Sequence, residues 1–370
     1  MLSHAAVADL IRSVPLRDFA SELVSAIEAT YGDRYLRSIE RTGWTQQLDT
    51  LEVMGCKSVD YTCVKVISSN PSLASAEIPA VAGTLVCTDA AADKARLVCD
   101  TAILTPFRTA AGTAVVLKRL KPRPVSIAII GAGLEGASHA LLLALLFRDV
   151  KHVTFVDRDP GRATAASKEV TQLIERADPG RVVEIVACES SDDVGDLYES
   201  DVIVTATYGT STVCDLRNRA KKQGKAFIAA VGADLQKKRE LDDSVYLNAR
   251  FVADDLAQCL RQGELQHAAP LLGLSQDEID AHKTHGGRLL DGRIIGVEDL
   301  LARGRGFGQR SELMTVYDST GFSGQDLAMA RVMIKLCEAR GLKRVPWNPG
   351  KTAFLADVLP EVDVARSQVT

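Results

Sequence analysis

The stretch Ile127-Ala128-Ile129-Ile130-Gly131-Ala132-Gly133-Leu134-Glu135-Gly136 decides the fold of this 370-residue chain. An apolar run precedes a G-x-G-x-x-G turn and the apolar segment 140–147 follows it, which is the order strand, tight turn, helix. A second apolar run, 153–156, ends at Asp157, 24 residues after Gly133. This arrangement predicts a dinucleotide site. Glycines let the backbone approach a pyrophosphate, the helix N-terminus supplies free N–H groups, and the acid is placed to bind a ribose hydroxyl.

From residue 125 onward the sequence predicts alternating strands and helices. Strands are expected at 125–130, 153–157, 182–187, 201–205, 226–231 and 250–253, with helices between most of them. This rhythm is typical of a parallel, doubly wound sheet. Residues 270–312 give no clear pattern. Residues 322–340 are helical in spacing, and an irregular tail is expected from Leu342.

The first 120 residues have a different character. Residues 5–30 have helical spacing and predict one or two helices. Short β-type runs at 51–54, 64–67, 83–87 and 96–99 predict a sheet built largely of antiparallel strands. A helix is expected over 110–120, with Arg108 or Thr109 near its start, and the prolines at 122 and 124 mark a domain boundary.

Composition excludes several classes of protein. The chain is 46% hydrophobic and 25% charged, with a net charge of 44 − 48 = −4 and no basic block, so nucleic acid is not expected as a partner. No signal-peptide pattern is visible, and the longest apolar run falls short of the ~18 residues that span a membrane. Eight cysteines without a C-x-x-C pair predict buried thiols in a reducing cytoplasm. His282 and His285 lack a third ligand nearby, so no metal site is predicted.

Polar residues that follow the predicted cofactor strands are candidates for chemistry. Thr205 and Ala206 come after the strand at 201–204, and Asp234 comes after an apolar strand and Gly232. Ligands of such sheets bind at the carboxyl ends of the strands. Asp234 therefore fits a general base with a raised pKa, although the position also fits an N-cap or turn aspartate.

Two cations lie in apolar surroundings in the first part of the chain. Lys65 lies inside an apolar strand, and Arg108 follows the apolar segment 102–107. A buried cation needs a partner, and the planar fork of arginine matches a carboxylate. Two interpretations stay open. One is that the cations bind an anionic ligand, and the other is that they form internal salt bridges or lie on an edge strand with a solvated face.

Four blocks of sequence form a recognisable set. They are Thr105-Pro106-Phe107-Arg108-Thr109-Ala110-Ala111, Val64-Lys65-Val66-Ile67-Ser68-Ser69-Asn70-Pro71, Val231-Gly232-Ala233-Asp234 with Arg239-Glu240-Leu241, and Asp318-Ser319-Thr320-Gly321-Phe322 with Gln325-Asp326-Leu327. In their order along the chain, from about residue 35 to 340, they resemble the ornithine cyclodeaminase/mu-crystallin family.

The resemblance implies an α/β fold in which an NAD(P)-binding Rossmann domain, 122–312, is inserted in an α+β domain, 1–121 and 313–370, that binds substrate and dimerises. By motif, the family's carboxylate clamp falls on Arg41, Lys65 and Arg108, the far side of its site on Thr320, and its acid/base aspartate on Asp234. Its cofactor positions fall on Thr109, Gly131, Gly133, Leu134, Glu135, Gly136, Asp157, Arg158, Thr205, Ala206 and Val231. Asp157 favours NAD, because a carboxylate repels a 2′-phosphate. Arg158 and Arg162 keep NADP open.

The resemblance also implies a small amino-acid substrate and a cytoplasmic homodimer. Glu52 resembles the glutamate with which cyclodeaminases meet a distal ammonium, and favours a diamino acid, although it also fits a strand-face charge. The expected reaction converts L-ornithine, or a related diamino acid, to a cyclic imino acid such as L-proline plus ammonia, with NAD recycled. Two alternatives stay open. One is NAD(P)-dependent imine reduction or amino-acid oxidation, including reductive coupling with a 2-oxo acid, and the other is ligand binding without turnover.

Gly55 and Glu135 depart from the cyclodeaminase pattern, which has proline and often glutamine there, and leave the substrate open.

Overall fold

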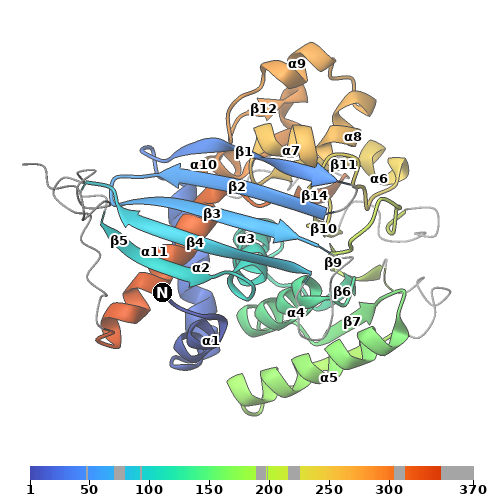
Figure 1. The fold of residues 1–370 in the computed structure, drawn as a ribbon. Coiled ribbons are helices and arrows are strands. Elements are labelled where there is room, and N and C mark those ends of the chain that lie inside the picture. Colours follow the sequence, from blue (N-terminus) through green and yellow to red (C-terminus); the bar gives the residue numbers. More distant parts are fainter. Residues whose placement is uncertain are drawn as a thin grey trace, which may run out of the picture.

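Two β-sheets organise the chain (Figure 1). The computed structural model describes residues 1–46, 49–70, 80–91, 94–188, 197, 199–215, 226–303 and 313–342. The first sheet is antiparallel and has the order β1 (Arg37–Gln46), β2 (Asp49–Lys57), β3 (Tyr61–Ser69), β4 (Val81–Asp89) and β5 (Ala95–Asp100). The prediction of an antiparallel sheet in this part of the chain is confirmed.

The second sheet has nine strands in the order β12-β13-β11-β14-β10-β9-β6-β7-β8. They are β6 (Ser126–Ile130), β7 (His152–Val156), β8 (Glu184–Ala187), β9 (Val202–Thr205), β10 (Phe227–Ala230), β11 (Ala249–Ala253), β12 (Arg288–Leu289), β13 (Ile294–Gly296) and β14 (Met314–Asp318). All pairs are parallel except β12 with β13. The predicted parallel sheet is confirmed, and each strand that was expected in it lies within two residues of its expected bounds.

Helices cover both faces of the second sheet and one face of the first. They are α1 (His4–Arg12), α2 (Leu16–Tyr31), α3 (Leu104–Leu120), α4 (Leu134–Leu146), α5 (Pro160–Ala177), α6 (Asp243–Leu247), α7 (Leu256–Gln262), α8 (Leu265–Leu271), α9 (Gln276–Ala281), α10 (Val297–Arg303) and α11 (Ser323–Ala339). Along β6, Ile127 and Ile129 join one core, whereas Ala128 and Ile130 join another, because successive side chains point to opposite faces. The sheet is therefore covered on both sides, as the doubly wound prediction requires.

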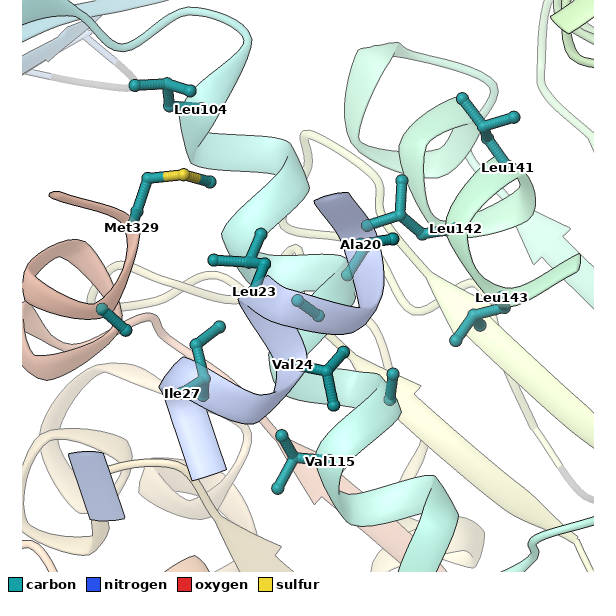
Figure 2. Close-up of a cluster of buried hydrophobic side chains, with 14 of the residues drawn as sticks. Ala20, Leu23, Val24, Ile27, Leu104, Val115, Leu141, Leu142, Leu143 and Met329 are labelled. Carbon is teal, nitrogen blue, oxygen red and sulfur yellow. The ribbon is translucent and has the colours of Figure 1, made fainter. Parts of the chain in front are cut away.

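The larger core joins the two sheets. Helix α11 packs against α2 and against β2 to β5, and α3 packs against both α2 and α4. Figure 2 shows Leu23 of α2, Val115 of α3, Leu142 of α4 and Met329 of α11 among the side chains of this core. Because α3 packs against α11, which covers the first sheet, and against α4, which follows the glycine turn, residues on α3 lie beside the predicted cofactor site.

Three expectations need correction or qualification. Helix α3 begins at Leu104 and not near Ala110, because Pro106 lies in its first turn, where a missing N–H costs no helical hydrogen bond. Strand β14 lies between β10 and β11 in the second sheet, although residues 313–370 were assigned to the first domain. The domain boundaries stay a prediction. The expected irregular tail beyond Leu342 lies outside the described residues.

Several exclusions can be compared with the described part of the chain. Six of the eight cysteines are buried there, none is in a disulfide, and no group of three or more metal-binding side chains is found in it. His282 ends α9, and His285 lies beyond that helix and contacts Asp255 (2.7 Å). None of the helices in the described residues is long and apolar enough to cross a membrane.

Candidate active site

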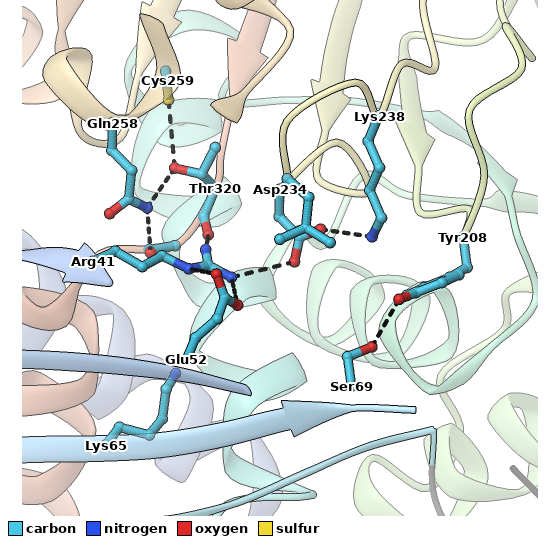
Figure 3. Close-up of polar contacts among 12 residues, drawn as sticks. Arg41, Glu52, Lys65, Ser69, Tyr208, Asp234, Lys238, Gln258, Cys259 and Thr320 are labelled. Atoms are coloured by element: carbon cyan, nitrogen blue, oxygen red, sulfur yellow. Dashed lines mark hydrogen bonds and ion pairs between the residues drawn. The ribbon is translucent and has the colours of Figure 1, made fainter. Parts of the chain in front are cut away.

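A cavity of about 320 Å³ lies where the carboxyl ends of the second sheet face the first sheet. Its wall includes Arg41 on β1, Lys65 on β3, Arg108 on α3, Glu135 at the start of α4, Asp234 after β10 and Thr320 after β14. Figure 3 shows several of these side chains converging from strands and loops that are far apart in sequence. The structure therefore brings the predicted substrate residues and part of the predicted cofactor turn to one place.

The three glycines of the turn differ in the space around them. Gly131 has φ +106°, and a Cβ there would collide with the carbonyl of Ala206, while a Cβ on Gly136 would collide with the carbonyl of Gly131. A Cβ on Gly133 would meet nothing within 4 Å. The first and third glycines are needed for the packing of the turn, whereas the second leaves open space directly at the N-terminus of α4.

The end of β7 supports this turn. Asp157 Oδ2 accepts a hydrogen bond from the backbone N–H of Ala132 (2.8 Å), and Oδ1 accepts one from Asp159 N (3.0 Å). Arg158 and Arg162 are exposed. An open glycine, a free helix N-terminus and a carboxylate beside them match what the pyrophosphate and ribose of a dinucleotide require. The residues present therefore fit NAD.

The other predicted cofactor residues divide into two groups. Thr109, Leu134 and Val231 line the cavity with Gly133. Thr205 does not line it, because its side chain is fully buried and donates to Glu240 Oε2 (2.7 Å). The Thr205 side chain thus points away from the expected nucleotide, and Ala206 contributes its backbone carbonyl to the packing of the glycine turn.

Glu240 ties together the loops that follow two neighbouring strands. Its carboxylate accepts hydrogen bonds from the Thr207 amide (2.6 Å) and hydroxyl (2.8 Å) after β9, and from Gly232 N (2.9 Å) after β10. Burial raises the pKa of Glu240, and the hydrogen bonds from Thr205 and Thr207 oppose that rise. These bonds fix the loop that carries Asp234.

Arg41 stands at the centre of the polar network in Figure 3. Its Nε donates to Glu52 Oε1 (2.7 Å), its Nη2 pairs with Glu52 Oε2, and its Nη1 donates to the carbonyl of Thr320 (2.9 Å). Nη2 also lies 3.7 Å from Asp234 Oδ2. Both oxygens of Glu52 are thus engaged by Arg41, and Glu52 is not among the residues that line the cavity.

Lys65 and Arg108 share one acid on α11. Lys65 Nζ donates to Asp326 Oδ1 (2.8 Å), and Arg108 Nε lies 3.5 Å from the same oxygen while its Nη1 donates to Gln325 Oε1 (2.8 Å). Among the described residues, Arg108 Nε and Asp326 Oδ2 are buried without a hydrogen-bond partner. Burial lowers the pKa of Lys65 to about 8, with Asp326 opposing the shift. The internal ion pairs of these cations are therefore observed, and because both cations also line the cavity, their binding of an anionic ligand stays a prediction.

Thr320 is held in place by residues beneath the cavity. Its hydroxyl accepts a hydrogen bond from Gln258 Nε2 (2.8 Å), and Asp254 Oδ2 accepts hydrogen bonds from Gly321 N (2.7 Å) and from the Ser319 hydroxyl (2.8 Å). The loop after β14 is thus fixed by a buried carboxylate, so its backbone carbonyl at Thr320 is a firm acceptor for Arg41.

Asp234 is an ionised carboxylate between two cations. Lys238 Nζ donates to Oδ1 (2.7 Å), and Arg41 faces Oδ2. Burial acts to raise the pKa of Asp234, but the charges of Lys238 and Arg41 outweigh it and hold the pKa below its ordinary value. The expectation of a raised pKa is therefore wrong. The reason is a pair of cations, one of them from another sheet.

Sequence reasoning gave no role to Lys238, Glu240 or Asp326, although two of them stood in the blocks that carried the resemblance. One signal was available. Asp326 is followed directly by the apolar run Leu327-Ala328-Met329-Ala330, and a buried acid there implies a buried cation opposite. Lys238 lies four residues after Asp234, but that spacing alone does not say that the two side chains meet.

The chain matches known proteins along most of its length. The model of the ornithine cyclodeaminase/mu-crystallin family matches residues 12–339. Iminosuccinate reductase of Paracoccus denitrificans is 32% identical over 241 residues, which are 65% of this chain and just under two thirds, 66%, of that protein. Ornithine cyclodeaminase of Brucella abortus is 24% identical over 337 residues, covering 90% of this chain and 84% of the relative.

A solved structure confirms the fold. An archaeal alanine dehydrogenase dimer with bound NAD is 21% identical, has a TM-score of 0.74, and is matched over 94% of this chain and 98% of its own. The predicted fold class, a Rossmann domain joined to an α+β domain, agrees with this similarity. From the family match over residues 12–339 we conclude that the chain belongs to the ornithine cyclodeaminase/mu-crystallin family.

Proposed function

We propose that this protein is an NAD-dependent enzyme that interconverts an amine and an imine at the Cα atom of a small α-amino acid. One observation carries the proposal. Three cations, Arg41, Lys65 and Arg108, share a cavity with the ionised Asp234 and with the open glycine at the N-terminus of α4. A site with a carboxylate clamp, an anion for an ammonium group and a dinucleotide turn matches an α-amino acid and NAD together.

NAD is the cofactor that the residues favour. Gly133 and the α4 N-terminus would hold the pyrophosphate, and Asp157 would meet the ribose, where it disfavours a 2′-phosphate. The solved alanine dehydrogenase relative carries NAD, which agrees with this choice. When bound, NAD would accept a hydride from Cα or return one to it.

The side chains that line the cavity would bind and orient the amino acid. Lys65 and Arg108 are the cations that bind the α-carboxylate, since Asp326 neutralises only part of their charge. Arg41, whose charge Glu52 already balances, closes the same wall. Asp234 accepts a hydrogen bond from the α-ammonium group and fixes its orientation. The site thereby holds Cα in one place before any bond changes.

Cyclodeamination of L-ornithine, or of a related diamino acid, to L-proline and ammonia is our first candidate reaction. It is favoured by Glu52, which accepts a hydrogen bond from Arg41 of the cavity wall. Glu52 also lies two residues before Met54, which lines the cavity. A diamino acid whose distal ammonium displaced part of the Arg41 contact would find a carboxylate there. The relative from Brucella abortus, named an ornithine cyclodeaminase, supports this candidate.

A net redox reaction is the second candidate. Both oxygens of Glu52 are already bonded to Arg41 and the side chain does not line the cavity, so nothing at Glu52 requires a second amine. The enzyme would then reduce an imine or oxidise an amino acid and consume the cofactor stoichiometrically. The 32% identical relative named iminosuccinate reductase supports this candidate.

One experiment tests the proposal and separates the candidates. The protein is incubated with L-ornithine, L-lysine, L-alanine or L-aspartate and a trace of NAD⁺, while ammonia, proline and NADH are measured. Ammonia and proline in excess over NAD⁺ identify cyclodeamination, whereas NADH formed in step with substrate loss identifies a net redox reaction. If no amino acid reacts, and if 2-oxo acids with ammonia and NADH are also inert, the proposed function is wrong and ligand binding without turnover remains.

We also propose that the protein forms a homodimer through the outer face of the first sheet. α11 covers one face of that sheet, while Trp44, Leu51 and Val66 on the other are 55%, 48% and 41% exposed. Contiguous apolar residues of this kind are typical of protein interfaces. The absence of a disulfide among the eight cysteines, all of which lie in the described residues, agrees with a reducing cytoplasm as the place of work.

A further inference from the structure

The cavity contains a second carboxylate besides Asp234. Glu135, the second residue of α4, lines the cavity. Its side chain is 29% exposed, and its Oε1 atom is buried without a hydrogen-bond partner among the described residues. Burial of a carboxylate oxygen without a hydrogen bond or water destabilises the ionised form of the side chain. The environment of Oε1 therefore favours the protonated form of Glu135.

The two carboxylates differ in the charges that face them. Lys238 donates directly to Asp234, and Arg41 lies 3.7 Å from it. Among the described residues, no cation comes within ion-pair distance of Glu135 except His139, whose Nδ1 lies 3.5 Å from Oε1. His139 is neutral at physiological pH, because burial lowers its pKa to about 4, and its Nδ1 donates to the Glu135 carbonyl (2.9 Å). Glu135 therefore has no firm charge partner.

The groups that act most strongly on Glu135 come from the elements around the cavity. They are Arg108 and the side chain of Thr109 on α3, Lys65 on β3 and Asp234 after β10, while the neutral His139 on α4 lies nearby. Burial raises the pKa of Glu135 to about 7, and the charge of Asp234 adds to the rise, while Arg108, Thr109 and Lys65 oppose it. At neutral pH Glu135 is thus divided between its two protonation states, whereas Asp234 is ionised.

We propose that Glu135 is a second catalytic residue of this site, which exchanges a proton with the amino group of the bound amino acid while Asp234 stays ionised and orients that group. The inference rests on the proposed function and extends it. In the oxidative direction an N–H bond of the substrate ammonium breaks and an O–H bond forms on Glu135. The nitrogen lone pair then becomes the second bond of C=N as Cα loses its hydride to NAD⁺. In the reductive direction Glu135 returns the proton.

Glu135→Gln is the sharpest variant, because glutamine keeps the size and polarity of the side chain and removes only its ability to titrate. Glu169→Gln, at an exposed position of α5, is the matched control for the loss of one negative charge. Asp234→Asn tests the other carboxylate. A residue with a purely packing role would tolerate the change at position 135, since glutamine fills nearly the same volume.

The activity test follows kcat/KM for amino-acid oxidation between pH 5.5 and 9. The wild type should show a limb that rises through a pH near 7 to a plateau, because the ionised form of Glu135 accepts the proton. In the reductive direction activity should instead fall as the pH rises through the same region. Glu135→Gln should lower kcat/KM about a hundredfold or more and lose that limb, while Glu169→Gln keeps both the rate and the limb.

A second readout needs no catalysis. A carboxyl whose pKa is raised by folding binds more protons in the native state than in the unfolded state, so it destabilises the fold as the pH rises through that interval. The unfolding midpoint of the wild type should therefore fall relative to that of Glu135→Gln between pH 5 and 8. No such divergence is expected between the wild type and Glu169→Gln.

Each result decides. If the limb near pH 7 persists in Glu135→Gln and disappears in Asp234→Asn, Asp234 is the proton acceptor and the inference is wrong. Parallel unfolding profiles of the wild type and Glu135→Gln would also overturn it, because Glu135 would then be ionised throughout. A wild type that reacts with no amino acid would sink the proposed function and with it the catalytic role of Glu135, while the unfolding profiles would still show whether Glu135 titrates near pH 7.

Discussion

At the scale of single residues, the network around Asp234 determines how the substrate amine is held. Lys238 and Arg41 keep this carboxylate ionised, so its strongest contribution is a charge-assisted hydrogen bond to the substrate ammonium. Removing one hydrogen bond to a charged group costs about 1.5–3 kcal/mol. The same residue therefore offers a measurable test of how the amine is bound.

Asp234→Asn should lower kcat/KM about tenfold to a hundredfold, because the amide keeps the shape of the side chain and loses its charge. The limb near pH 7 should remain, since we assign it to Glu135. Steady-state kinetics with the preferred amino acid measure both effects. Asp277→Asn, on the exposed face of α9, serves as the control, and an unchanged kcat/KM in Asp234→Asn would rule out this role.

Lys65 gives the site a second pH dependence. Burial lowers its pKa to about 8, so the ammonium form is lost as the pH rises through that value, and the α-carboxylate then loses one of its cations. The KM for the amino acid should rise above pH 8 in the wild type. Lys65→Arg, which stays charged throughout, should show a flatter KM profile between pH 7 and 9.5 even if its KM is higher overall. Parallel profiles would mean that Lys65 does not bind the carboxylate.

At the scale of elements, the glycine turn separates folding from cofactor binding. Gly131 has a positive φ and no space for a Cβ, whereas Gly133 has open space. Gly131→Ala should therefore destabilise the protein by about 1–3 kcal/mol, whereas Gly133→Ala should keep the wild-type unfolding midpoint and bind NAD at least tenfold more weakly. Calorimetry and thermal unfolding measure the two quantities. Gly32→Ala, at the end of α2, is the control, and wild-type NAD affinity in Gly133→Ala would exclude the turn as the pyrophosphate site.

Local patterns explain why most elements could be predicted from sequence. Apolar runs bounded by turn residues marked β2 to β11, whereas β12, β13 and β14 were not expected, and the G-x-G-x-x-G spacing marked the join of β6 and α4. Strand β1 gave no signal, because most of its side chains are exposed and its apolar positions do not alternate. The helix was expected to start near Ala110, whereas α3 starts at Leu104 and holds Pro106 in its first turn, where proline is tolerated.

The candidate site was predictable only in part, for a different reason. Residue types and motif spacing pointed to the clamp cations, Asp234 and the glycine turn, and the structure brings them to one cavity. The ionisation of Asp234 was not predictable, because it depends on Arg41, which comes from another sheet. The pairing of Glu52 with Arg41 likewise needs the register of β1 and β2, which a single sequence does not give. The protonation state of a side chain depends on which charged groups lie near it in the fold, and a sequence motif does not identify those neighbours.

At the scale of the whole molecule, the exposed face of the first sheet tests the proposed homodimer. Trp44 and Leu51 are directly opposite each other on β1 and β2 and both are largely exposed. Trp44→Lys should shift the protein from dimer to monomer in size-exclusion chromatography with light scattering, because a buried charge in an apolar interface is costly. Val182→Lys, at an 84% exposed position before β8, should leave the mass unchanged. A dimer that survives Trp44→Lys would place the interface elsewhere.

The ion pair between Lys65 and Asp326 joins residues that are 261 positions apart, and this separation matters while the chain is being made. On the ribosome, the strands of the first sheet emerge long before α11, so Lys65 and Arg108 exist for most of translation without the acid that balances them. The sheet also waits for α11 to cover its inner face. Until its last described helix is synthesised, the nascent protein therefore has a positively charged first sheet whose inner face is uncovered. Premature termination before Ser323 would leave a product that exposes both the charges and the apolar face.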